Sequence, residues 1–196
     1  MPKKFIMMLG PQGSGKSTQA KLLAGKLNYL FISSGDLLRT LKEENNPIGV
    51  KLAEYWMKGE LVPDNLITDI LFGVFEKENT LGFVLDGFPR DLDQLESFLA
   101  EAGLKDWTLD KVFYLQLTDE EALERIKKRK EIENRPDETK KALEKRFTLY
   151  HEKTEKLLSK YSEMGKLVVI DGSKSVEEIH NVIISHTQNN SPSIPI

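Results

Sequence analysis

A glycine-rich stretch near the N-terminus carries residues that could hold phosphate: GPQGSGKST at residues 10–18. It matches in full the pattern G-x-x-x-x-G-K-[ST], with Gly10, Gly15, Lys16 and Ser17 at the defining positions. Glycines in such a loop let backbone N–H groups converge on phosphate oxygens, and the helix that follows adds its positive N-terminal end. Lys16 would reach the β- and γ-phosphates, and Ser17 or Thr18 could face Mg²⁺. The stretch therefore predicts a triphosphate site.

The stretch GFVLDGFPR at residues 82–90 is a second candidate. Asp86 ends an apolar run, which is the usual place of a carboxylate that holds Mg²⁺ through water in a phosphate-binding fold. We expect Asp86 and Ser17 to hold the same ion. Arg90 follows where an open α/β sheet has its ligand crevice. On these residues alone, a helix-capping aspartate and a surface arginine explain the stretch equally well.

Four arginines form a third candidate group. Arg125 and Arg129 are four residues apart and share one helical face. Arg135 and Arg146 are eleven residues apart, about three helical turns, so they too can share a face. Charge runs usually form a solvated surface, and the neighbouring lysines fit that interpretation. Arginine, however, binds phosphate through two parallel hydrogen bonds, which favours a phosphate-binding role for these four.

Five apolar runs predict the strands that position these residues: 5–9, 30–33, 83–86, 112–117 and 167–171. The runs are continuous rather than alternating, which is typical of strands buried on both faces. Amphipathic stretches predict the helices: 17–27, 64–78, 91–103, 119–131 and about 137–161. This order predicts an α/β fold, a doubly wound parallel sheet of five strands with helices on both faces.

Two segments interrupt the alternation of strands and helices. Residues 34–62 predict two short helices separated by NNPIG, and residues 128–138 include RPDE. Neither contains an apolar run long enough for a strand, so we expect both to be mobile elements of one domain that spans residues 1–196. The polar, proline-containing end at 188–196 predicts a flexible tail.

The composition excludes several classes of function. The 196 residues suit one domain, and 28 Lys and Arg against 31 Asp and Glu give a net charge of -3, which provides no field for binding nucleic acid. The absence of cysteine excludes disulfides and cysteine-ligated zinc, and it favours the cytoplasm. The apolar run at 5–9 is too short to span a membrane, so we expect no membrane partner.

From Phe5 to about Ile184 the sequence resembles the adenylate kinase family. The resemblance rests on GPQGSGKSTQA, ISSGDLLR, GELVPDNLI, GFVLDGFPRDLDQ, the four arginines and VIDGSKSVEEI, in the family's order and spacing. It implies a three-layer P-loop fold and a monomer that transfers the γ-phosphoryl group of ATP to AMP with Mg²⁺. Only KEIEN separates Arg129 from Arg135, which resembles the family's short-lid branch.

The resemblance also implies a role for each site residue. Those implied for ATP are Gly13, Ser14, Gly15, Lys16, Ser17, Thr18, Arg125, Arg129 and the backbone of Lys174. Those implied for AMP are Ser34, Arg39, Glu60, Leu61, Val62, Gly87, Phe88, Pro89, Arg90, Gln94, Arg135 and Arg146. The implied catalytic residues are Lys16, Arg90, Arg125, Arg129, Arg135 and Arg146. Residues 34–62 would form the AMP-binding segment and residues 128–138 the lid.

The chain departs from the family's usual residues at several positions. Ser17 stands where glycine is usual, and Ser34 stands where threonine is usual. The usual Asp-Asp pair is replaced by Asp137 and Glu138, after an unusual Pro136. None of these changes removes a charge that the chemistry needs, but Ser17 leaves the details of magnesium contact open.

Two alternative functions fit parts of the same pattern. A UMP/CMP kinase of this architecture tends to carry Asn in place of Gln94 and Ala in place of Ser34. A nucleotide-binding switch that transfers no phosphate would need a base-specificity motif such as N-K-x-D, which the sequence lacks. It would also have no use for a second site lined by arginines. Both comparisons favour the adenylate kinase interpretation.

Overall fold

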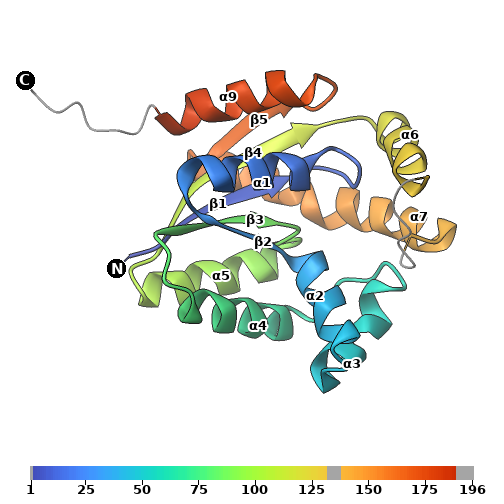
Figure 1. Ribbon diagram of the computed structural model, residues 1–196, viewed down its shortest axis with the longest axis horizontal. Coiled ribbons are helices and arrows are strands. Elements are labelled where there is room, and N and C mark those ends of the chain that lie inside the picture. Colours follow the sequence, from blue (N-terminus) through green and yellow to red (C-terminus); the bar gives the residue numbers. More distant parts are fainter. Residues whose placement is uncertain (1, 132–137, 189–196) are drawn as a thin grey trace, which may run out of the picture.

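Five parallel strands form the central sheet of the computed structural model, which describes residues 2–131 and 138–188 (Figure 1). The strands are β1 (Lys4–Leu9), β2 (Leu30–Ser33), β3 (Gly82–Asp86), β4 (Thr108–Gln116) and β5 (Leu167–Asp171). They lie in the order β2-β3-β1-β4-β5, and every neighbouring pair is parallel. The predicted sheet is therefore confirmed, and Met8 near the end of β1 lies opposite Asp86 at the end of β3.

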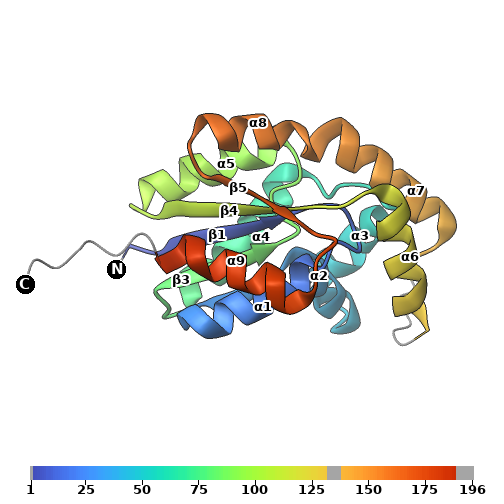
Figure 2. The same ribbon diagram turned by 90° about the horizontal axis from the view of Figure 1, so that it is seen from above.

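Helices cover both faces of this sheet (Figures 1 and 2). One face is covered by α1 (Lys16–Leu27) and α9 (Val176–Gln188), and the other by α4 (Asp64–Lys77), α5 (Leu92–Leu104) and α8 (Lys156–Glu163). Phe5 and Met7 of β1 belong to the core beneath α4 and α5, whereas Ile6 and Met8 belong to the core beneath α1 and α9. Within the described part of the chain, no helix is both long and apolar enough to cross a membrane.

An aromatic cluster fills the core between the sheet and α4 and α5. The ring of Phe5 lies 5.0 Å from Phe75, 5.3 Å from Phe83 and 5.1 Å from Phe98, measured between centroids. All four rings are buried. Each buried phenylalanine contributes about 1.5–3 kcal/mol through the surface it removes from water, so this cluster anchors the strands whose ends carry the candidate residues.

The segment at residues 34–62 contains two helices, as its sequence predicts. They are α2 (Ser34–Glu43) and α3 (Pro47–Trp56). The expected separator NNPIG is only partly a connection, because Pro47 is the first residue of α3 and the side chain of Asn46 caps that helix by accepting from the N–H of Ile48 at 3.0 Å. We refer to residues 34–62 as the insertion.

The helix predicted over about 137–161 differs from the observed one. Asp137 lies outside the described residues, and the described helix begins after Thr139, whose hydroxyl caps α7 (Lys140–Leu149). A π-helical turn, η1 (Tyr150–Thr154), then joins α7 to α8. The N–H of Glu155 donates to the carbonyl oxygen of Tyr150, five residues back, at 2.9 Å. The pattern of apolar residues gave no sign of this turn.

Two other elements differ from their predictions. Strand β4 begins at Thr108 rather than at Val112, because the polar residues before Val112 pair with the first residues of β1. Helix α9 was not among the predicted helices, although its start carries a capping signal. The N–H of Ser175 donates to the Glu178 carboxylate at 2.9 Å, and the N–H of Glu178 donates to the Ser175 hydroxyl at 3.2 Å.

Helix α6 (Asp119–Lys130) leads into the predicted lid. Of the lid residues 128–138, the structure describes 128–131 and Glu138, and the remainder lies outside the described residues. The predicted tail at 188–196 also lies outside them, apart from Gln188 at the end of α9. The predictions of a lid and a tail therefore stay predictions.

Candidate functional site

A cavity of about 450 Å³ opens at the carboxyl edge of the sheet. Its walls come from the glycine-rich loop, the ends of β2 and β3, the insertion, α6 and α7. Most of the predicted site residues line it: Gly13, Gly15, Lys16, Ser17, Thr18, Ser34, Arg39, Glu60, Leu61, Val62, Asp86, Gly87, Pro89, Arg90, Gln94, Arg125, Arg129 and Arg146. The fold thus brings the three candidate groups of the sequence to one place.

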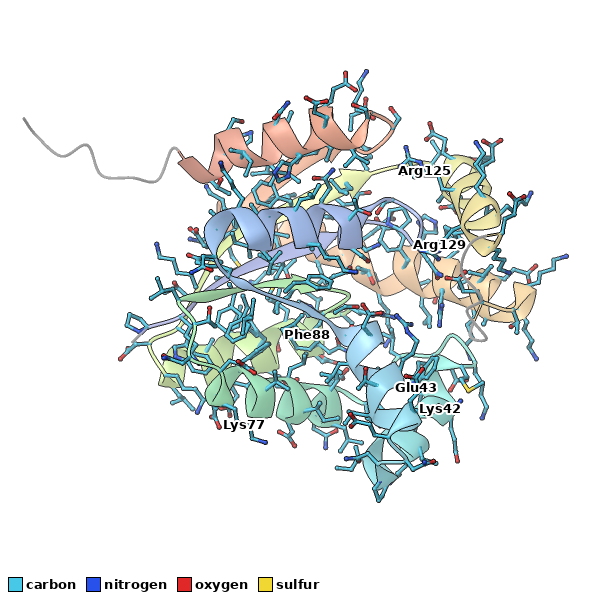
Figure 3. All side chains as sticks on the ribbon, viewed as in Figure 1. Lys42, Glu43, Lys77, Phe88, Arg125 and Arg129 are labelled. Carbon is cyan, nitrogen blue, oxygen red and sulfur yellow. The ribbon has the colours of Figure 1, made fainter. Side chains whose placement is uncertain are left out.

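The other predicted site residues lie elsewhere. Ser14 and Lys174 line a second cavity of about 320 Å³, which shares four lining residues with the first: Gly13, Gly15, Thr18 and Arg125. The ring of Phe88, which Figure 3 labels, is buried. It packs in the core against Phe98 with ring centroids 6.2 Å apart, so only the backbone of Phe88 is available to a ligand. Arg135 lies outside the described residues.

Two glycines of the loop are required by close packing. Gly10 and Gly13 have φ angles of +141° and +90°. A Cβ at Gly10 would lie 2.5 Å from the backbone oxygen of Leu115, and one at Gly13 would lie 2.6 Å from that of Ala122. Any larger residue would push the loop away from β4 or α6. Helix α1 begins at Lys16, directly behind the loop, and its first residues line the cavity, so the end of the helix with unpaired N–H groups lies there.

Lys16 is half-buried at the start of α1, and its Nζ donates to the carbonyl oxygen of Pro11 at 2.7 Å. Burial lowers the pKa of its ammonium group from 10.5 to about 8. The carboxylate of Asp86 opposes this shift, whereas the positive charges of Arg90 and Arg129 reinforce it. The charged form of Lys16 is therefore destabilised in the free protein, and a bound anion would stabilise it.

We expect the ammonium group of Lys16 to titrate near pH 8 in the free protein, compared with about 10.4 for lysine in a peptide. The measurement is NMR of side-chain-labelled lysine over pH 6 to 11, with Lys16→Met to assign the signal. Because an anion favours the charged form, inorganic triphosphate should move the transition to higher pH. A midpoint that stays near 10 in the free protein would contradict the burial of this charge.

Oxygen atoms of Ser17 and Asp86 meet on the floor of the cavity. The Ser17 hydroxyl donates to a carboxylate oxygen of Asp86, which is 6 % exposed at the end of β3. Hydroxyl and carboxylate oxygens are suitable ligands for Mg²⁺, so these residues fit such an ion. The described residues contain no cluster of three or more His, Asp or Glu that could hold a metal. An ion at this place would therefore take its other ligands from water or phosphate.

A turn after β3 forms another stretch of the cavity wall. The carbonyl oxygen of Gly87 accepts from Arg90 Nε at 2.8 Å and from the Ser34 hydroxyl at 2.7 Å. Gly87 has a φ of +79°, and a Cβ there would lie 2.7 Å from the Ser34 oxygen. Arg39 of α2 forms an ion pair with Asp36. Arg90 of the turn and Arg39 of the insertion thus both line the cavity.

The arginines of α6 and α7 complete the wall. Figure 3 shows Arg125 and Arg129 projecting from α6 toward the start of α1. Arg125 Nη2 donates to the carbonyl oxygen of Ser173 at 3.3 Å, beside the second cavity. Arg146 Nη2 donates to the carbonyl oxygen of Trp56 at 2.9 Å. Helix α7 therefore contacts the insertion through a cavity-lining arginine.

A second contact between α7 and the insertion lies beside the first. Lys145 Nζ donates to Glu60 Oε1 at 2.6 Å, and both side chains are more than one-third exposed, so water and salt screen this pair. Gly59 lies against α7, where a Cβ would come within 2.4 Å of the backbone oxygen of Ala142. The insertion is packed against α7 in this conformation.

Two residues that had no predicted site role join these parts. The carboxylate of Glu138 is 1 % exposed, forms an ion pair with Arg129, and accepts from Gln12 Nε2 at 2.8 Å. Gln12 Oε1 in turn accepts from Arg146 Nη1 at 3.3 Å. Glu138 had two sequence signals, as the last residue of the predicted lid and as part of the pair that replaces the family's Asp-Asp, and Gln12 had only its place inside the glycine-rich loop.

Comparisons with known proteins agree with this geometry. Residues 8–166 match a family model described as "Adenylate kinase". The chain is 40% identical over 184 residues to an adenylate kinase of Bifidobacterium longum, covering 93% of this chain and 99% of the relative. It is 37% identical over 178 residues to an adenylate kinase of Micrococcus luteus, covering 89% and 85%. One from Thermobifida fusca is 36% identical over 178 residues, covering 89% and 93%.

Proposed function

The chain belongs to the adenylate kinase family, and from this premise we propose how its own residues transfer the γ-phosphoryl group of ATP to AMP to give two ADP. The observation that carries the proposal is the composition of one cavity. Lys16 and the glycine-rich loop line it, and a second set of residues, the pair Arg39 and Arg90, lines the same cavity. A site for a single triphosphate does not need the second pair, whereas a reaction between two nucleotides does.

We assign the donor part to ATP. The loop and Lys16 would bind its phosphates, and Arg125 and Arg129 would bind the same phosphates. The second cavity, which adjoins the loop and includes Lys174, has room for the adenine of ATP, which the Lys174 backbone would bind. The proposed residues are Gly13, Ser14, Gly15, Lys16, Ser17, Thr18, Arg125, Arg129 and Lys174.

We assign the acceptor part to AMP. Arg39 and Arg90 would bind its phosphate and Gln94 its adenine, with the insertion as the outer wall. The proposed residues are Ser34, Arg39, Glu60, Leu61, Val62, Gly87, Pro89, Arg90, Gln94 and Arg146, with Phe88 through its backbone and Arg135 from outside the described residues.

The proposed mechanism needs no general base. An oxygen of the AMP phosphate is already anionic at neutral pH, so it can attack the γ-phosphorus while the bond to the bridging oxygen of ADP breaks. The protein contributes position and charge. Lys16, Arg90 and Arg146 line the same cavity and would neutralise the charge that spreads over the transferring group.

We propose that Mg²⁺ accompanies ATP, held through water by Ser17 and Asp86. When bound, the ion would neutralise part of the triphosphate charge. The hydroxyl of Ser17 already lies on the Asp86 carboxylate, so the departure from glycine at this position adds an oxygen to the site. We also propose that the insertion and residues 128–138 close over the nucleotides and exclude water, in a cytoplasmic monomer.

The test is an acceptor comparison with ATP and Mg²⁺. We expect AMP to be phosphorylated with a kcat/KM at least about 10²-fold above that of CMP, UMP or dTMP, because Gln94 can pair with both a donor and an acceptor of adenine. A coupled assay for nucleoside diphosphate measures all four. Faster turnover of CMP or UMP would favour the pyrimidine kinase alternative, and ATP hydrolysis that no monophosphate stimulates would favour a nucleotide switch.

A further inference from the structure

Two neighbours hold the side-chain amide of Gln94 in one orientation. Gln94 lies in the first turn of α5 and is 2 % exposed, yet it lines the cavity. Its Oε1 accepts from the backbone N–H of Arg90 at 2.8 Å, and its Nε2 donates to Asp64 Oδ1 at 3.0 Å. Asp64 is the first residue of α4, which follows the insertion in the sequence.

The chemistry of these neighbours excludes the flipped amide. A backbone N–H can only donate, so the atom of Gln94 that faces Arg90 must be the oxygen. An ionised carboxylate can only accept, so the atom that faces Asp64 must be the nitrogen. In the flipped orientation both contacts would be repulsive. The two restraints act from different elements, and either one alone would leave the amide less firmly held.

The fixed orientation determines what the amide can offer to a base. Each bond uses one of the two hydrogen-bonding positions at its atom, which leaves Oε1 able to accept and Nε2 able to donate once more. Adenine offers a donor at N6 and an acceptor at N1, which matches. A 6-oxo purine offers an acceptor at O6 and a donor at N1, which would require the flipped amide.

We propose that Asp64 is a positioning residue that makes the acceptor site select 6-amino over 6-oxo purine nucleotides. The inference rests on the proposed function, since it takes Gln94 to face the acceptor base. Asp64 is half-buried, and Asp91, Asp93 and Lys153 are the charged groups that act on it. Burial raises the pKa of its carboxyl group, while the bond from Gln94 lowers it and so favours the accepting, ionised form.

The experiment compares AMP with IMP, the 6-oxo analogue without further substituents, in the wild type and in Asp64→Asn. Asparagine keeps the size but can either accept from or donate to Gln94, so one restraint is lost. We expect the ratio of kcat/KM for AMP to that for IMP to fall at least about tenfold, with KM for ATP unchanged. Asp69→Asn is the matched control, because it removes the same charge from an exposed position on α4 that is not among the groups acting on Asp64. It should leave the ratio unchanged.

Each outcome decides one of the two proposals. A wild-type chain that does not phosphorylate AMP overturns the proposed function. An active wild type that uses AMP and IMP equally overturns the role of the fixed amide, even if no variant folds. An equal ratio in the wild type and in folded Asp64→Asn, or an equal fall in both variants, overturns the role of Asp64. Asp64→Ser, whose hydroxyl can also donate or accept, should lower the ratio in the same direction.

Discussion

Lys16→Met should lower kcat by about 10³-fold or more while the protein stays folded. Lys16 provides a positive charge at the start of α1, where the γ-phosphate of ATP is proposed to lie, and a preorganised charge of this kind is worth about 10²–10³ or more in rate. Methionine fills a similar volume and removes a charge whose pKa burial has lowered to about 8. We therefore expect the thermal midpoint to stay the same or rise.

The control for this variant is Lys26→Met, the same substitution at an exposed position on the same helix. It should keep near-wild-type turnover. Steady-state assays with saturating ATP and AMP give kcat, and thermal denaturation followed by circular dichroism gives the midpoint. A Lys16→Met protein that retains a tenth of the wild-type rate, or that loses activity only because it unfolds, would remove Lys16 from its assigned role.

Arg90→Ala should lower kcat/KM for AMP by about 10³-fold while changing ATP binding little. The Arg90 guanidinium is oriented by its Nε bond to the Gly87 carbonyl, and a well-placed arginine is worth about 10³–10⁵ in phosphoryl transfer. The backbone of Arg90 is fixed separately, since its carbonyl oxygen accepts from the Thr154 hydroxyl at 2.7 Å. The turn should therefore survive the loss of the side chain.

Arg90→Lys separates charge from geometry. Lysine keeps the charge but cannot form two parallel bonds to phosphate or the Nε bond to Gly87, so its activity should fall between wild type and alanine. The measurement is kcat/KM for AMP, with the dissociation constant of ATP from calorimetry. If alanine weakens ATP binding as much as it lowers AMP use, Arg90 does not belong to the acceptor part alone.

The inner strands could be predicted because they are buried on both faces, whereas the edge strands β2 and β5 are only partly buried. Phe5, Ile6, Met7 and Met8 are all nearly inaccessible, so their run is continuous and leaves a clear signal. The start of β4 is only partly buried and polar, so pairing with β1 rather than composition makes it a strand. The π turn depends on one extra residue in a helical pattern that composition does not reveal.

The candidate site was predictable where one local stretch carries the chemistry. The glycine-rich loop is such a stretch, and the structure places it at the cavity. The partners of its residues were not predictable, because they come from distant positions. Glu138 reaches Gln12 across 126 residues, and Asp64 reaches Gln94 across 30. The pair Asp64 and Gln94 forms because α4 packs on α5, and the pair Glu138 and Gln12 forms because the residues before α7 lie against the loop.

The π turn at η1 corrects the phase of the helix that carries Arg146. A regular α-helix turns about 100° per residue, so Thr154, eight residues on, would point about 80° away from Arg146. One residue taken up by the wider turn reduces that difference to about 20°. Both residues line the same cavity, with Arg146 bonded to the insertion and Thr154 to Arg90. The continuous helix α7–η1 thus contacts two separate parts of the site. Inserting or deleting one residue between Arg146 and Thr154 would turn one of these side chains away from its partner, so the site depends on the number of residues in this helix as well as on their identity.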